Sequence, residues 1–238
     1  MSLNGVWGAE FLRRNQRYGR HMAAKIIAVF NQKGGSGKST ISTNLAGALG
    51  LDSRKTMVID LDPQGTASIV IGNAPEDQPF PAACANLAML AKPDQEIRKY
   101  VDDYEFIIID CPPAIASAAP SRALLIADLG LIPVGASGGN VWAIGEAKKL
   151  GQRAQDLNDD LQLRTLANMN QNTAVVQHVF SELDNDSEVP ALKTRIGLRT
   201  AYKEAELLGK SVLQIKGAKE AHREIKALKK EILEILEN

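Results

Sequence analysis

The sequence predicts an α/β fold in which helices cover both faces of a mainly parallel, twisted sheet. Short apolar runs rich in β-branched residues alternate with longer helical stretches along the chain, and this alternation is typical of parallel sheets. A glycine-rich turn follows the first apolar run directly and leads into a helix. With 238 residues and 45% hydrophobic content, the chain can bury one substantial core, so we expect a single domain.

Six apolar runs are predicted to be strands, and the stretches between and after them are predicted to form helices. The strands are expected at residues 25–30, 56–60, 105–110, 129–134, 163–168 and 189–194. The helices are expected near residues 38–50, 84–100, 118–127, 141–158, 172–184, 199–208 and 216–236. Ligands of open parallel sheets bind outside the carboxyl ends of the strands, so the residues that follow these runs are candidate site residues.

Residues 1–22 differ in composition from the rest of the chain. They carry four arginines among glycine, asparagine and glutamine residues, whereas the segment that begins at Met22 leads straight into the first predicted strand. We interpret residues 1–22 as a disordered leader or an expression remnant, and residues 23–238 as the folded domain. An arginine arm that contacts polyanions is the alternative interpretation.

Charge, cysteine content and hydropathy exclude several classes of protein. The formal net charge is zero, so no global field argues for a nucleic-acid or membrane partner, and any basic surface must be local. Cys84 and Cys111 lie far apart without metal-ligand spacing, which suits a reducing compartment. No apolar run reaches the roughly 18 residues of a membrane span, and the leader lacks the apolar stretch of a secretion signal. We therefore expect a cytoplasmic protein.

The segment from Lys33 to Thr40, KGGSGKST, follows the first predicted strand. Its glycines allow consecutive backbone N–H groups to face one anion, and the following helix adds its positive N-terminal end. Lys38 can reach the β- and γ-phosphates of a nucleotide, and the Ser39 hydroxyl can ligate Mg²⁺. The ordinary P-loop pattern asks for glycine where Gln32 stands, so the segment fits a variant with an added lysine, Lys33. A plain glycine turn is the alternative, and we predict a P-loop NTPase fold.

Two carboxylates close the second predicted strand, in the segment from Met57 to Gly65. The alternation of side chains along an extended chain places Asp60 and Asp62 on the same side. A carboxylate beside a nucleotide can hold the waters of the metal or orient the attacking water, because phosphoryl transfer needs positioning and charge management. A strand that ends in an acidic Pro-Gly turn is the alternative interpretation.

The third predicted strand also ends in an acid, in the segment from Phe106 to Pro113, FIIIDCPP. A buried aspartate is costly unless a partner or a cation lies close to it, so Asp110 predicts a nearby metal ion, as in a Walker B strand. Many parallel strands end this way, so this motif is informative because it lies in register with the two motifs described above. Pro112 and Pro113 cannot continue a ladder, so the chain must leave the sheet there.

With these three motifs, the chain resembles the ParA/MinD group of deviant-Walker ATPases and is most similar to the small ParA-type, ParF-like DNA partition ATPases. The resemblance covers about residues 24–236 and implies ATP and Mg²⁺ as cofactors. It implies catalytic roles for Lys33, Lys38 and Asp62, and it places near the metal Ser39, Asp60 and Asp110. It implies nucleotide contacts from Gly34, Gly35, Ser36, Gly37, Lys38, Ser39 and Thr40.

The added lysine has a particular meaning in this family. The resemblance implies that Lys33 crosses a nucleotide-sandwich dimer and touches the phosphates of the partner copy, while Asp62 positions the hydrolytic water. A second cation delivered by another subunit would act as an arginine finger does. The resemblance therefore implies an ATP-dependent homodimer, with assembly beyond the dimer left open. A solvated Lys33 that only softens the anion field of the loop is the alternative.

Several amides close the fifth predicted strand, between Thr165 and Asn172. Members of the family contact the adenine base in this part of the chain, and Asn168 and Asn170 are the candidates. An asparagine offers both a donor and an acceptor to the base. Asparagine is also common in turns at strand ends, so the alternative is a structural role.

Charge is unevenly distributed in the last third of the chain. Residues 191–230 contain 11 Lys and Arg against four Glu, whereas residues 154–190 are acidic. A basic tract of that size can grip DNA phosphates without reading sequence, and family members bind nonspecific duplex DNA through this portion. The candidate DNA contacts are Arg195, Arg199, Lys216 and Lys219. A solvated helix face with i,i+4 ion pairs is the alternative.

The resemblance implies a partition ATPase that dimerises on ATP, coats chromosomal DNA as a nucleoid-associated cytoplasmic protein, and segregates a plasmid or chromosome. A ParB-type centromere-binding partner protein would stimulate its turnover. One alternative is a ParA-like positioner of a protein complex or microcompartment. Another is a MinD-like membrane ATPase, but residues 225–236 lack an aromatic anchor and are followed by Glu237, so we do not expect a membrane partner. A nitrogenase-type iron protein is disfavoured because Cys84 and Cys111 do not form a convincing cluster pair, and a metabolic ligase is disfavoured because the sequence reveals no substrate pocket.

Overall fold

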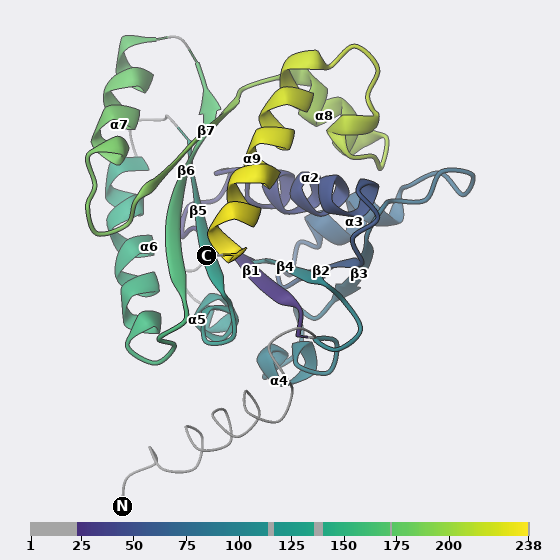
Figure 1. Ribbon diagram of the computed structural model, residues 1–238, viewed down its shortest axis with the longest axis horizontal. Helices are drawn as coiled ribbons and strands as arrows, with labels where there is room; N and C mark the ends of the chain where they lie inside the picture. Colours follow the sequence, from purple (N-terminus) through teal and green to yellow (C-terminus); the bar gives the residue numbers. More distant parts are fainter. Residues whose placement is uncertain (1–22, 114–116, 136–139, 172, 238) are drawn as a thin grey trace, which may run out of the picture.

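The computed structural model describes residues 23–113, 117–135, 140–171 and 173–237 (Figure 1). The predicted leader, residues 1–22, therefore lies outside the described residues. None of the helices in these ranges is long and apolar enough to cross a membrane.

A seven-stranded sheet forms the centre of the described chain, and all of its strand pairs are parallel. The strands are β1 (Lys25–Val29), β2 (Thr56–Asp60), β3 (Ala83–Asn86), β4 (Phe106–Asp110), β5 (Leu129–Gly135), β6 (Gln162–Asn170) and β7 (Ala191–Gly197). Their order across the sheet is β3-β2-β4-β1-β5-β6-β7. The order reverses direction around β1, which is the kind of position where open parallel sheets bind their ligands.

Helices cover both faces of the sheet (Figure 1). The helices are α2 (Lys38–Leu51), α3 (Thr66–Gly72), α4 (Pro93–Ile97), α5 (Ala119–Leu124), α6 (Asn140–Gln155), α7 (Ala174–Asp184), α8 (Thr200–Leu207) and α9 (Lys219–Glu237), with a 3₁₀ turn η2 (Val212–Gln214). Apolar residues of α2, α8 and α9 pack together on one face, and those of α5, α6 and α7 pack on the other. This arrangement confirms the predicted fold class.

The apolar run of β1 shows why the sequence forms this sheet. Ile27 and Val29 belong to the apolar cluster on the α2 side, whereas Ile26 and Ala28 belong to the cluster on the opposite side. Successive side chains of a strand point to opposite faces, so a strand that is covered on both sides needs an unbroken apolar run. The run Phe106–Asp110 of β4 is likewise buried at all five positions.

In the second quarter of the chain one prediction was wrong and one helix was missed. Residues 84–100 do not form a long helix: Ala83–Asn86 is the edge strand β3, which pairs with Met57–Asp60, and only Pro93–Ile97 is helical. The short helix α3 was not predicted. Alanine favours helix on its own, but pairing with the rim of a formed sheet overrides a weak local preference.

The register of the sheet brings the three sequence motifs to one edge. Val29, at the end of β1, lies opposite Asp110 of β4, and Asp110 in turn lies opposite Asp60 of β2. The glycine-rich loop, the acidic turn and the acid of the third motif therefore leave the sheet side by side. The remaining predicted elements were found with shifted ends, the largest shift being the last strand, which runs over Ala191–Gly197.

Candidate functional site

The glycine-rich loop connects β1 to α2 and leaves the start of α2 open to an anion. Gly37 precedes the helix with φ 86°, and Gly35 has φ 72°, so both lie in the left-handed region that favours glycine. No side chain caps this end of α2, and its first turn contains no acidic residue. The uncapped N–H groups and the positive end of the helix dipole together form an anion-binding site.

The end of β6 braces this loop from the side. Asn168 is buried, and its Nδ2 donates a hydrogen bond to the carbonyl oxygen of Ser36 at 2.8 Å. A Cβ atom at position 37 would lie 2.2 Å from the same Nδ2, so only glycine permits this close approach. Asn170 Oδ1 accepts a hydrogen bond from Gln177 Nε2 at 3.2 Å. Contact of either asparagine with adenine stays a prediction, and the structure adds a bracing role for Asn168.

Lys38 lies across the loop with its side chain largely buried. Its Nζ donates to the carbonyl oxygen of Lys33 at 3.1 Å. Burial lowers the pKa of Lys38, and the nearby Asp110, Cys111 and Asp62 oppose this shift. A cation that contacts only a backbone carbonyl in an anion-binding loop can exchange that carbonyl for a phosphate oxygen, which is a stronger, charge-assisted acceptor.

Asp110 is fully buried beneath the first turns of α2. Its Oδ1 accepts a hydrogen bond from Ser42 Oγ at 3.0 Å, whereas its Oδ2 has no hydrogen-bond partner in the described structure. Burial raises the pKa of Asp110 to about 7; the hydroxyls of Ser39 and Ser42 oppose the shift, and Asp60 adds to it. An orphaned carboxylate oxygen near a serine hydroxyl fits a divalent cation, which would favour the ionised form.

The donor set fits Mg²⁺ in particular. The described residues contain no group of three or more His, Cys, Asp or Glu that could hold a metal without further ligands. Mg²⁺ is usually held by one or two protein ligands, and it completes its shell with waters and phosphate oxygens. The candidate residues are Ser39 and Asp110, and the third predicted member of the set, Asp60, is engaged differently.

Asp60 shapes the acidic turn. Its Oδ1 accepts a hydrogen bond from the backbone N–H of Asp62 at 3.0 Å, and its Oδ2 accepts hydrogen bonds from both the backbone N–H and the hydroxyl of Ser68 at 2.8 Å. Ser68 is the third residue of α3, so the carboxylate caps that helix. Metal binding by Asp60 stays a prediction. Ser68 was missed by sequence reasoning, and no spacing in the sequence points to it.

Asp62 lies at the tip of this turn and is partly exposed. Its Oδ1 accepts a hydrogen bond from the backbone N–H of Gln64 at 2.9 Å. Gly65 closes the turn with φ 66°, and its N–H donates to the carbonyl oxygen of Asp62 at 2.8 Å. The turn therefore fixes one carboxylate oxygen of Asp62 and leaves the carboxylate reachable from solvent, as a water-orienting group requires.

The four candidate DNA contacts fall into two pairs. Arg195 Nη2 contacts Asp184 Oδ2 at 2.5 Å, and its guanidinium stacks over the ring of Phe180. Arg199 donates to Glu224 Oε1 through Nε at 2.9 Å and through Nη2 at 2.5 Å. The structure therefore engages both arginines in ion pairs within the chain.

The two lysines are placed differently. Lys216 and Lys219 flank Gly217 at the start of α9, and both are exposed. Neither has an ion pair in the part of the chain that the structure describes. The exposed face of α9 adds three cations that sequence reasoning did not single out, Arg223, Lys226 and Lys230. Of these, Arg223 pairs with Glu220 and Lys230 with Glu234 along the same helix. Together with Lys219 the three cations are spaced by four, three and four residues, which is the spacing of one helix face and could have identified them.

A glycine-rich loop between a central parallel strand and a buried helix, with a lysine in the loop and an acid on the neighbouring strand, defines a P-loop nucleotide-binding protein. Residues 27–228 match the family described as the CobQ/CobB/MinD/ParA nucleotide binding domain. The chain belongs to this family, and the match confirms the resemblance seen in the sequence.

Two relatives are similar to this chain over part of its length. The chain is 29% identical over 191 residues to maintenance of carboxysome distribution protein A from Halothiobacillus neapolitanus. The aligned region covers 79% of this chain and 87% of that protein. It is 31% identical over 164 residues to the chromosome partitioning protein ParA from Myxococcus xanthus. The aligned region covers 53% of this chain and 57% of that protein.

Two solved structures share the fold. A complex of McdA from Cyanothece with ATP superposes with a TM-score of 0.73 at 16% identity, over 88% of this chain and 96% of that chain. Cobyrinic acid a,c-diamide synthase from Mycobacterium smegmatis, solved with ADP and magnesium, superposes with a TM-score of 0.62 at 21% identity, over 78% of this chain and 91% of that chain.

Proposed function

We propose that this chain is a Mg²⁺-dependent ATPase that dimerises when ATP is bound, binds duplex DNA without sequence specificity, and uses ATP turnover to segregate a plasmid or chromosome region in the cytoplasm. The observation that carries the proposal is the meeting of Lys38, Asp62 and Asp110 at the carboxyl edge of three neighbouring strands, around an uncapped helix start. Solved relatives hold ATP, or ADP with magnesium, and support the choice of ligand.

The residues at this edge divide the work of phosphoryl transfer. The backbone N–H groups of the loop and Lys38 bind the phosphates, while Ser39 and the orphaned oxygen of Asp110 hold the Mg²⁺ ion, directly or through water. The bound ion supplies charge neutralisation at the phosphates. Asp62 orients the attacking water, and Asp60 keeps the Asp62 turn in place through the Asp62 N–H and Ser68.

Lys33 makes the site dependent on a second copy of the chain. It is half-buried at the rim of the loop, and in a dimer it would reach the phosphates bound by the partner copy and stabilise the charge of the transition state. The test is the size of the particle with Mg²⁺ and a nonhydrolysable ATP analogue, for the native chain and for Lys33→Gln. A native dimer and a monomeric variant support this role, whereas an unchanged dimer in the variant removes it.

The basic face of α9 is the proposed DNA surface, together with Lys216. The apolar face of the same helix, which carries Ala221, Ile225, Leu228, Ile232 and Leu236, is buried in the core. The helix is therefore anchored, and its cations point outward at fixed spacing. This burial also argues against a MinD-like membrane role, because the apolar residues that would enter a bilayer are already packed.

Binding of random duplex DNA across a salt series tests the surface. When a surface binds DNA phosphates, the logarithm of the affinity falls linearly with the logarithm of the salt concentration. Each phosphate contact adds about −0.9 to the slope. A steep slope supports the proposal. Salt-insensitive or absent binding defeats it.

A second candidate function is the positioning of a large protein complex, because the relative that matches 79% of this chain is a carboxysome distribution protein. In that case the same ATPase and DNA surface would position a large protein complex. ATP turnover is measured with DNA alone, with the candidate partner protein alone, and with both. Strong stimulation by the pair supports either distributing function, and no stimulation contradicts both. A ParB-type partner that binds a centromere-like DNA site favours segregation, and a partner that binds a protein complex favours positioning.

A further inference from the structure

The side chain of Asn44 joins the first turns of α2 to the C-terminal part of the chain. Its Nδ2 donates to the carbonyl oxygen of Thr40 at 2.8 Å, and its Oδ1 accepts a hydrogen bond from the backbone N–H of Val212 at 2.7 Å. Both Asn44 and Val212 are buried, and they lie 168 residues apart in the sequence. One amide group thus bridges a residue of the nucleotide-binding segment and the start of η2.

The surrounding contacts make this bridge close and rigid. A Cβ atom at Gly47, one turn further along α2, would lie 2.5 Å from Ser211 Cβ, so glycine allows the two segments to approach. Ser211 caps η2 in a capping box with Gln214. The carbonyl oxygen of Ile215 is hydrogen-bonded to His222 Nε2 at 3.0 Å, which ties the end of η2 to α9.

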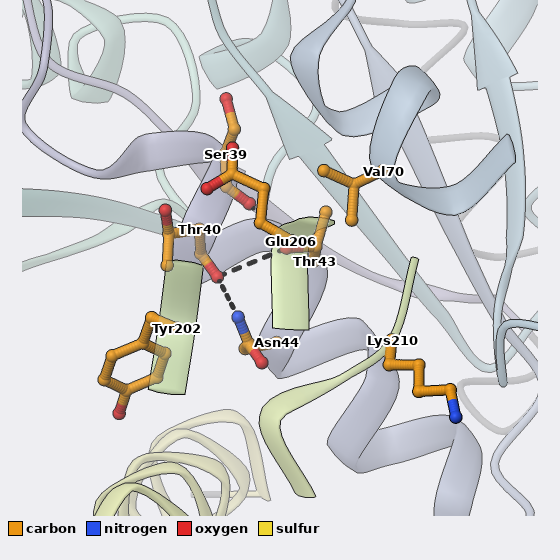
Figure 2. Close-up of a pocket in the computed structure, with 8 residues that line it drawn as sticks. All are labelled: Ser39, Thr40, Thr43, Asn44, Val70, Tyr202, Glu206 and Lys210. Carbon is orange, nitrogen blue, oxygen red and sulfur yellow. Dashed lines mark hydrogen bonds between the residues drawn. The ribbon is translucent and has the colours of Figure 1, made fainter. Parts of the chain in front are cut away.

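Helix α8 faces the same turns of α2. Figure 2 shows a pocket in which Ser39, Thr40, Thr43 and Asn44 from α2 lie opposite residues of the C-terminal part. These opposing residues are Tyr202, Glu206 and Lys210. Tyr202 Oη in turn donates to Glu224 Oε2 of α9 at 3.0 Å. Helix α9 is therefore linked to both α8 and the end of η2, and these elements lie against the first turns of α2.

Residues 211–219, here called the connector segment, have two different ends. One end is docked on α2 through the Val212 N–H and Ser211. The other end carries the exposed Lys216 and Lys219, separated by Gly217 with φ 80°. Only a few residues lie between the hydrogen bond to Asn44 and these cations, so the path from Val212 to them is short.

We propose that Asn44 is a positioning residue that transmits nucleotide occupancy from α2 to the connector segment and thereby sets the orientation of Lys216 and Lys219. The inference rests on the proposed function, because it assumes that a nucleotide binds at Ser39 and Thr40. A phosphate bound by the N–H groups of the first turn shifts the peptide units of that turn. Asn44 follows the Thr40 carbonyl, and Val212 follows Asn44, because both hydrogen bonds are short and directional.

Hydrogen–deuterium exchange of the connector segment tests this inference in the full chain, with and without Mg²⁺·ADP and a nonhydrolysable ATP analogue. In the native chain, nucleotide is expected to change the exchange rate of the Val212–Ile215 amides by about fivefold or more. In Asn44→Ala, the same amides exchange faster, and nucleotide changes their rate by less than about twofold, while the nucleotide Kd stays within about threefold of native.

Ser211→Ala is the matched control, since it removes the cap of η2 but leaves both hydrogen bonds of Asn44 in place. It should raise exchange in the segment and retain the nucleotide response. A full nucleotide response in Asn44→Ala overturns the inference, and so does a native chain that binds nucleotide without any response in residues 211–219. A native chain that does not bind nucleotide overturns the proposed function as well. If Asn44→Ala does not fold, Asn44→Ser and the native measurement decide.

Discussion

The nucleotide site and the basic tract hold their charges in opposite ways. At the carboxyl edge of the sheet, Lys38, Asp60 and Asp110 are buried, and the fold fixes each of them among a few polar neighbours. In the C-terminal tract the charges lie at the surface, and some are paired with acids while others are not. The role of a buried charge can therefore be inferred from its neighbours. A surface charge indicates a binding partner only once its ion pairs within the chain are known.

The largest effect is expected at the buried lysine. Lys38→Ala removes the cation that lies across the glycine-rich loop, and we expect ATP turnover to fall at least about 100-fold because transition-state charge is left unbalanced. Steady-state phosphate release measures the loss. Lys149→Ala is the control, since Lys149 pairs with Glu146 on the surface of α6. Native-like turnover in Lys38→Ala would place the chemistry elsewhere in the molecule.

Gly37→Ala tests the brace between the loop and β6. The substitution puts a Cβ atom 2.2 Å from Asn168 Nδ2 at a position with φ 86°, so we expect the free energy of unfolding to fall by about 2–4 kcal/mol. Chemical denaturation gives the value. Gly34→Ala should leave stability nearly unchanged, because no atom lies within 4 Å of a Cβ there. Equal stability of the two variants would show that the loop relaxes away from Asn168.

The comparison is sharpest between Arg199→Ala and Lys219→Ala. Loss of Arg199 leaves Glu224, whose side chain is only 10% exposed, without its cation, so the free energy of unfolding should fall by about 1–3 kcal/mol. Lys219→Ala should leave stability unchanged and reduce the slope of log affinity for DNA against log salt by about 0.9. Denaturation and DNA titration are run on both variants. The reverse assignment, with Arg199 governing the salt slope, would restore the arginine as a DNA contact.

The smallest effect is expected at Asp128, at the opposite edge of the sheet. Burial raises the pKa of Asp128, and the Ile26 N–H and Lys25 oppose the shift. The unfolded chain therefore loses this proton at lower pH than the folded chain, and stability falls as the pH rises from about 4 towards the raised value. Asp128→Asn removes that loss, so its stability relative to the native chain should rise as the pH increases from about 4. A constant difference across this range would contradict the shift.

The sequence predicted the central strands and the three motifs because each depends on local pattern. An unbroken apolar run needs cover on both faces, and KGGSGKST needs a strand before it and a helix after it. What could not be predicted depends on distant partners. The bond from Asn168 to Ser36 joins residues 132 positions apart, and Ala83–Asn86 becomes a strand only because β2 offers it a ladder. The arginines of the basic tract belong to the same group, because Asp184 and Glu224 capture them after folding.

The central place of β1 has a consequence for synthesis of the protein. Its two neighbours are β4 and β5, and the backbone N–H of Ile26 donates to a carboxylate 102 residues later in the chain. At about 5–20 residues per second, β1 leaves the ribosome roughly 5–20 s before β5 follows it. Because β4 lies between β1 and β5 in the chain, β1 can gain its first neighbour before β5 appears, but the middle of the sheet stays incomplete until β5 has been made. The glycine-rich loop, which follows β1 directly, therefore lies beside an incomplete sheet until β5 has been made.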